Sequence, residues 1–137
     1  MLASVSARPG NPYADDLAAV ESELSRAMNS PATELPASAA LADVPNVDAQ
    51  RELADTLMDA SRAMPLRLSA GDSLARSIQR FGPLVSAAQE RALLAAFDGA
   101  TDPAIRASTA AVIGALRPKS LPVGQRLRNF QPAGATR

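Results

Sequence analysis

The chain has 137 residues, with 14 acidic and 14 basic side chains and neither cysteine nor histidine. This length suits one domain, and the missing cysteine excludes disulfides and thiolate metal sites. Hydrophobic residues make up 47% of the sequence but aromatic residues only 3%. A core of alanine and aliphatic side chains favours closely packed helices, and no alternating run typical of a strand is present, so we expect an all-α protein.

Charge is distributed unevenly along the chain. Residues 1–59 hold ten acidic residues against three arginines, whereas residues 103–137 hold six basic residues and no acid. Such a gradient can steer a charged partner or align copies head to tail. No run approaches the roughly 18 apolar residues of a membrane span, and the first ten residues do not resemble a signal peptide. We therefore expect a soluble, cytoplasmic protein without a membrane partner.

Prolines divide the chain into helix-sized segments. Pro45, Pro65, Pro83, Pro103 and Pro118 follow one another at intervals of 15 to 20 residues. Proline is tolerated in the first turn of a helix and ends the helix before it. The spacing predicts helices joined by short turns, arranged as helical hairpins in series.

Three helix pairs are expected. In the first pair, an outer helix over residues 13–28 precedes a short inner helix that Pro36 interrupts. The second pair turns near Met64 and Pro65, and the third turns near Gly99, a natural helix terminator. The pairs cover residues 12–44, 47–81 and 83–116 of a helical domain 12–117, which lies between a flexible segment 1–11 and a basic tail 118–137.

The second and third pairs repeat one another. A shift of 39 positions superposes similar residue types along the two second helices. The superposed residues include Leu66 and Ile105, Arg67 and Arg106, Ser69 and Ser108, and Leu74 and Ile113. A fainter copy upstream repeats the run Ser-Arg-Ala-Met at an offset of 36. Self-similarity at this period is typical of helical repeat arrays.

The second helix of the third pair carries the clearest local signals. Asp102 can accept hydrogen bonds from the first free amides, and Pro103 fits the first helical position. An apolar stripe follows at helical spacing, which predicts a buried face. Its residues are Ile105, Thr109, Val112 and Leu116, with Ile113 beside them, and the corresponding stripe of the second pair is Leu66, Ala70, Leu74 and Ile78.

The run from Asp102 to Leu116 resembles the second helix of a HEAT repeat, as does the period of 39 residues. The residues that carry the resemblance are Asp102, Pro103, Ile105, Arg106, Ala110, Ile113, Gly114 and Leu116. It implies a short α-solenoid of about three antiparallel helix pairs, whose second helices line a concave face that binds protein partners. In that family an arginine just inside the second helix commonly ties neighbouring repeats together. The resemblance thus implies inter-repeat structural roles for Arg67 and Arg106, and for Asp102 at the turn.

The sequence offers no constellation for catalysis. Without histidine or cysteine, the commonest nucleophile–base pairs and most transition-metal sites are missing, and Lys119 follows no glycine-rich phosphate loop. An acidic stripe at helical spacing is either a solvated outer face or a dock for a cation or a basic partner. It consists of Asp48, Glu52, Asp55 and Asp59. We expect no enzyme, no catalytic residue, no cofactor and no metal site.

Polar groups on the second helix of the second pair are candidates for partner contact. Because they lie away from its apolar stripe, the HEAT resemblance implies that they face the concave side. They are Asp72, Arg76, Gln79 and Arg80. Two neighbouring guanidinium groups would suit a carboxylate or a phosphate.

A second candidate contact is the alanine face of the last expected helix. A nearly chargeless face is unusual at the end of a solenoid, and apolar residues in the tail also need a surface to cover. The face holds Ala104, Ala107, Ala111 and Ala115, and the tail residues are Leu121, Val123, Leu127 and Phe130. Either the tail folds back onto this face or a second chain docks there.

We expect a non-catalytic protein–protein interaction scaffold whose partner is another protein or a second copy of the chain. One alternative is a structural segment of a larger repeat assembly or homo-oligomer. Another is a HEAT-like lyase that attaches bilin chromophores, which the resemblance alone suggests. A third is weak nucleic-acid binding through the basic tail, which the scarcity of aromatic residues disfavours.

Overall fold

The computed structural model describes residues 13–117, and these residues form helices and no strand. The helices are α2 (Ala14–Ala27), α3 (Glu34–Leu41), α4 (Val47–Met58), α5 (Met64–Phe81), α6 (Ala87–Gly99) and α7 (Pro103–Leu116). The prediction of an all-α protein is confirmed for this part of the chain. No helix in it is long and apolar enough to cross a membrane. The expectations for residues 1–11 and for the tail, including Leu121, Leu127 and Phe130, lie outside the described residues.

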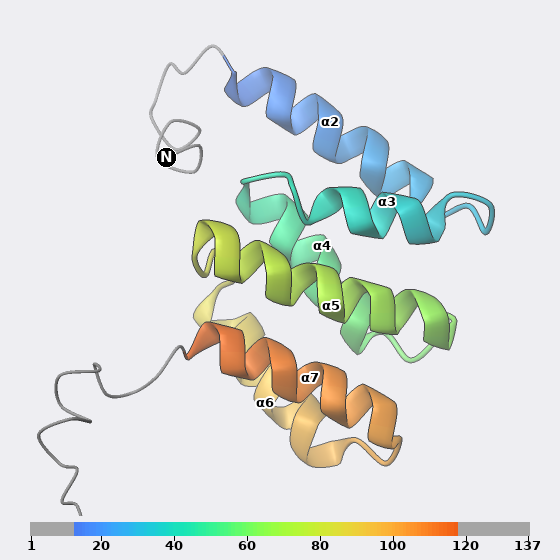
Figure 1. Ribbon diagram of the computed structural model, residues 1–137, viewed down its shortest axis with the longest axis vertical. Helices are drawn as coiled ribbons and strands as arrows, with labels where there is room; N and C mark the ends of the chain where they lie inside the picture. The colour runs from blue at the N-terminus through green and yellow to red at the C-terminus, as the bar shows by residue number, and fades with distance from the viewer. Residues whose placement is uncertain (1–12, 118–137) are drawn as a thin grey trace, which may run out of the picture.

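Three of the helices form a layer (Figure 1). α3, α5 and α7 run side by side in the same direction, and α5 contacts both of its neighbours. Behind them, α4 contacts α5 and α6, and α6 contacts α7. α2 packs on α3 and α4. We call the exposed surface of α3, α5 and α7 the front face.

A single apolar core joins these helices. α5 lies at its centre, because it packs against α3 and α7 on its sides and against α4 behind. The predicted stripe of α5 is buried along its whole length, and each large aliphatic side chain buried in this way contributes about 1.5 to 3 kcal/mol. Large side chains with at most 1% of their area exposed include Met28, Leu41, Leu53, Leu57, Leu66, Leu74, Leu93 and Val112.

The start of α7 matches its sequence signals. The Asp102 carboxylate accepts hydrogen bonds from the amides of Ala104, at 2.8 Å, and Ile105, at 3.1 Å, and Pro103 is the first helical residue. The predicted stripe turns inward, with Ile105, Thr109 and Val112 buried. Ile113 is half-buried, whereas Val112 has no exposed area.

Pro36 does not interrupt the inner helix of the first pair, contrary to expectation. α3 begins at Glu34, so Pro36 lies in its first turn. The missing N–H of proline is tolerated there because the first amides of a helix have no intrahelical acceptor.

The first helix of the third pair begins at Ala87, four residues after Pro83. Gly82 ends α5 with a φ of +84°, a backbone conformation that glycine adopts without strain. Ser86 and Gln89 then form a capping box, in which each side chain bonds the backbone of the other residue. This reciprocal cap, and not the proline, sets the start of α6.

Candidate functional site

The front face of α5 carries all four polar residues predicted for partner contact. Asp72, Arg76, Gln79 and Arg80 are exposed, because the buried stripe of α5 faces the opposite side of the helix. Because a helix has 3.6 residues per turn, the polar positions and the buried positions fall on different sides of α5. The structure therefore brings these residues together along one exposed face.

Arg80 is paired within the protein. Its Nη1 lies 2.6 Å from an Asp43 carboxylate oxygen, and both side chains are more than half exposed. Its guanidinium group also lies over the Phe81 ring, 5.1 Å from the centroid. An exposed ion pair of this kind contributes at most about 1 kcal/mol, so Arg80 mainly links the end of α5 to the loop after α3.

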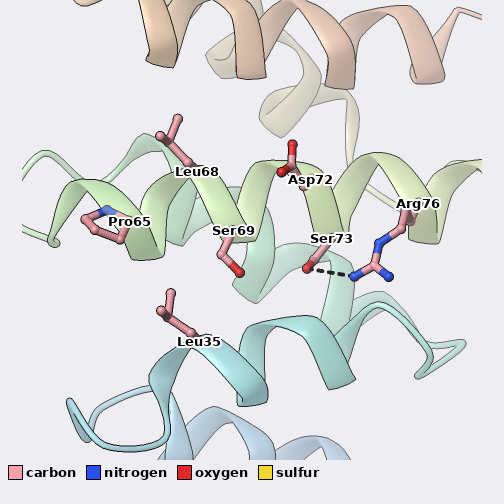
Figure 2. A pocket seen from close by; sticks show the side chains of 7 residues that line it. All are labelled: Leu35, Pro65, Leu68, Ser69, Asp72, Ser73 and Arg76. Carbon is pink, nitrogen blue, oxygen red and sulfur yellow. Dashed lines mark hydrogen bonds between the residues drawn. The ribbon is translucent and has the colours of Figure 1, made fainter.

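Arg76 and Asp72 have no oppositely charged partner among the described residues. Arg76 Nη2 donates to Ser73 Oγ at 3.4 Å, and within residues 13–117 no ion pair or hydrogen bond holds the Asp72 side chain. The two residues are four positions apart, a spacing that allows pairing on a helix. In Figure 2, however, Asp72 points toward α7 and Arg76 toward α3. Two separate charges are thus presented to solvent.

A groove between α3 and α5 lies beside Arg76 (Figure 2). Its volume is about 630 Å³, and apolar side chains line one end while Asp72, Ser73 and Arg76 line the other. The apolar lining residues are Leu35, Pro65 and Leu68. Leu35 is 43% exposed, so this part of the groove lining is open to solvent. At the base, the hydroxyls of Ser38 and Ser69 share a hydrogen bond that joins the two helices.

A second groove lies between α5 and α7. Its volume is about 740 Å³, and no charged residue lines it. The lining residues are Ile78, Gln79, Gly82, Pro83, Ala111, Gly114 and Ala115. Ala111 and Ala115 belong to the alanine face predicted from the sequence, and Ala107 is exposed one turn earlier on α7. We call this hollow the α5–α7 groove.

The two arginines near the helix starts make their contacts inside their own helix pairs. Arg67 Nε donates to the Leu57 carbonyl at 3.0 Å, which joins α5 to the end of α4. The Arg106 guanidinium lies over the Phe97 ring, 4.8 Å from the centroid, which joins α7 to α6. Arg67 and Asp102 also line one cavity of about 380 Å³, which lies between the α4–α5 turn and the α6–α7 turn.

Further direct ties between the pairs come from two residues that were not predicted from the sequence, Gln50 and Arg62. Gln50 on α4 has no exposed area. Its amide nitrogen donates to Ser77 Oγ at 3.1 Å and to the Gly82 carbonyl at 3.0 Å, and its oxygen accepts from the Leu84 amide at 2.8 Å. Gln50 therefore fixes the linker that leads to α6. The signal was its spacing of three from Leu53, on the apolar side of α4.

Arg62 ties the first pair to the second. From the turn between α4 and α5, it donates to the Met28 carbonyl at 3.2 Å and to Asn29 Oδ1 at 2.8 Å. These acceptors follow the last turn of α2, where carbonyl groups have no intrahelical donor. Arg62 of the second pair thus caps the C-terminal end of α2 in the first pair.

The four carboxylates of the acidic stripe have different surroundings. Asp48 pairs with Arg51 at 3.0 Å, and Asp55 accepts from Gln89 at 3.4 Å. Burial raises the pKa of Glu52, an effect that Arg62 opposes. Hydrogen bonds from Ser61 lower the pKa of Asp59. The four carboxylates do not converge, and within residues 13–117 no group of three acidic residues could hold a metal ion.

Comparison of the chain with family models, with curated proteins and with solved structures finds no match. An assignment of function therefore rests on the geometry of the chain itself.

Proposed function

We propose that the chain is a non-catalytic protein-binding scaffold, a short HEAT-like α-solenoid that binds its partner on the front face. Support for the solenoid comes from the 39-residue offset between the second and third pairs and from the second helices, which lie side by side in one layer. In repeat proteins such a layer provides an extended surface for partners.

The observation that carries the proposal is the two exposed charges of Asp72 and Arg76, which have no oppositely charged partner within residues 13–117. Both residues lie on α5, which packs against α3, α4 and α7. Arg76 stands at one end of the α3–α5 groove, whose other end is apolar. A partner helix or extended segment would place an aliphatic side chain against Leu35 and Leu68, and a carboxylate against Arg76, in the manner of peptide recognition by a groove.

Affinity capture with matched variants tests the proposal. The wild-type chain, the front-face double variant Asp72→Ala/Arg76→Ala and the rear control Asp48→Ala/Arg51→Ala are each used as bait. Each double variant removes one acid and one arginine from an exposed helix surface. A protein retained by the wild type and by the control, but lost by the front-face variant, supports the proposal. Equal retention by all three baits contradicts it.

A second candidate function is a structural segment that associates end to end. The observation that favours it is the exposure of apolar side chains at α2: Tyr13, just before the helix, is 63% exposed and Val20 is 49% exposed. Burial of such side chains against another copy would be favourable. Light scattering after size exclusion distinguishes the candidates, because end-to-end association raises the mass with concentration and Val20→Glu should abolish the increase.

A further inference from the structure

Gly114 lies on the exposed side of α7 in its last turn, two residues before Leu116. A Cβ atom added at Gly114 would meet nothing within 4 Å. Glycine is a weaker helix former than alanine, by up to about 1 kcal/mol. Gly71 on α5 differs, because there an added Cβ would overlap Ser108. At Gly71 the close approach of Ser108 accounts for the glycine. At Gly114 a segment of chain packed against α7 would account for it in the same way.

The α5–α7 groove lies where such a segment would be needed. Gly114 and Ala115 line it, and the chain continues from Arg117 just beyond. The groove is apolar and has no charged lining residue. Leu121 follows Arg117 by four residues, which span at most about 14 Å when extended. The first apolar residue of the tail can therefore reach the groove without unwinding α7.

The charges of residues 13–117 and of the tail are complementary. All 14 acidic residues of the chain lie within residues 13–117, which hold nine arginines, whereas residues 118–137 hold four basic residues and no acid. Asp72 has no partner among the described residues and points toward α7 (Figure 2). It lies seven residues before Gln79 on α5, or about 10 Å along the helix axis. The nine residues from Arg117 to Arg126 span up to about 30 Å, enough to cross the groove and reach Asp72.

We propose that residues 118–137 bind back onto the same molecule along the α5–α7 groove. Leu121 and Val123 cover the apolar lining next to Gly114, and Arg126 or Arg128 pairs with the Asp72 carboxylate. The tail is then an intramolecular occupant of one half of the front face. This inference goes beyond the proposed scaffold function, because the tail binds whether or not a partner protein exists. It assigns Asp72 to the tail and leaves Arg76 and the α3–α5 groove to a partner.

Limited digestion of the full chain with trypsin tests the proposal, since the tail supplies its own cleavage sites after Arg126 and Arg128. Proteolysis tracks the population of the open form, so cleavage in the folded chain should be at least about tenfold slower than in a synthetic peptide of residues 118–137. Gly114→Glu places a charge in the groove and should raise the rate to that of the peptide. Ala95→Glu, on the exposed side of α6, is the matched control and should keep the wild-type rate.

Asp72→Asn provides a second variant that changes one exposed side chain without adding bulk, and it should accelerate cleavage after Arg126 or Arg128. Circular dichroism establishes that each variant is folded. Cleavage of the wild-type tail at the rate of the free peptide overturns the proposal. So does protection that survives both Gly114→Glu and Asp72→Asn. Protection that increases with protein concentration also overturns it, because the occupant would then be the tail of a second copy.

Discussion

Gly71 on α5 faces Ser108 on α7 so closely that a Cβ atom at Gly71 would overlap the serine hydroxyl. The same Cβ would lie 3.3 Å from Ser108 Cβ and 3.3 Å from Leu57 Cδ1 on α4. Glycine therefore allows the second and third pairs to approach each other. The Ser108 hydroxyl is buried without a hydrogen-bond partner among the described residues. Side-chain size, and not a polar interaction, determines this contact.

Gly71→Ala should lower the free energy of unfolding by about 1 to 2 kcal/mol, because overpacking costs about 1 to 3 kcal/mol and the higher helix propensity of alanine offsets only part of it. Urea denaturation measures the change. A variant as stable as the wild type would mean that α5 and α7 are farther apart than the structure shows.

Ser108→Ala provides the matched background for this substitution. Removal of a buried, unpaired hydroxyl should be neutral or stabilising by up to about 1 kcal/mol. In the Ser108→Ala background, Gly71→Ala should cost about 1 kcal/mol less than in the wild type, since the overlapping atom is gone. Equal costs in the two backgrounds would show that the clash involves Leu57 alone.

Gln50→Leu should destabilise the protein by about 2 to 4 kcal/mol, because it leaves the Leu84 amide and the Gly82 carbonyl without the side chain that binds them. Thermal and urea unfolding measure the loss. Gln79→Leu is the control, since Gln79 is exposed, and it should change stability by no more than about 0.5 kcal/mol. Equal effects of the two substitutions would contradict the central position of Gln50.

Local signals predicted local features correctly. The stripe of α5 and the cap at Asp102 depend on residues within one or two helical turns, and both are present. The third pair was predicted to begin at Pro83, and its first helix begins four residues later, at Ala87, after the Ser86 capping box. Partners of Gln50 lie 27 to 34 residues away, a separation that periodicity does not address. The grooves beside α5 could not be predicted either, because they depend on the distance between helices.

The contribution of Glu52 to the free energy of unfolding should decrease as the pH rises. Burial raises the pKa of Glu52 from its ordinary value of 4.5, so the folded state binds its proton more tightly than the unfolded state. The contribution is complete below about pH 4.5 and is lost as the pH rises through the pKa of the folded state. Glu52→Gln should therefore gain stability relative to the wild type between about pH 4 and pH 7 in urea titrations.

Asp59→Asn should show the opposite trend in the same titrations. Hydrogen bonds from the Ser61 hydroxyl and amide lower the pKa of Asp59 from its ordinary value of 3.8. Asp59 thus contributes stability that is present above about pH 3.8 and is lost as the pH falls through the pKa of the folded state. The variant should lose stability relative to the wild type as the pH rises. Parallel profiles for the two variants would show that neither pKa differs between the folded and unfolded states.

Arg62→Ala should release α2 without unfolding the rest of the protein. α2 has no fully buried residue, and Arg62 supplies hydrogen bonds to the Met28 carbonyl and to Asn29. The loss of bonds from a charged donor costs about 1.5 to 3 kcal/mol, which corresponds to at least a tenfold drop in hydrogen-exchange protection where the opening is local. That drop should be confined to α2 and the loop after it, while α5 and α7 keep their protection. Arg26→Ala removes an exposed pair with Glu23 on the same helix and should change protection by less than about threefold. A uniform drop across all helices in Arg62→Ala would show instead that α2 is part of the same cooperative unit as α5.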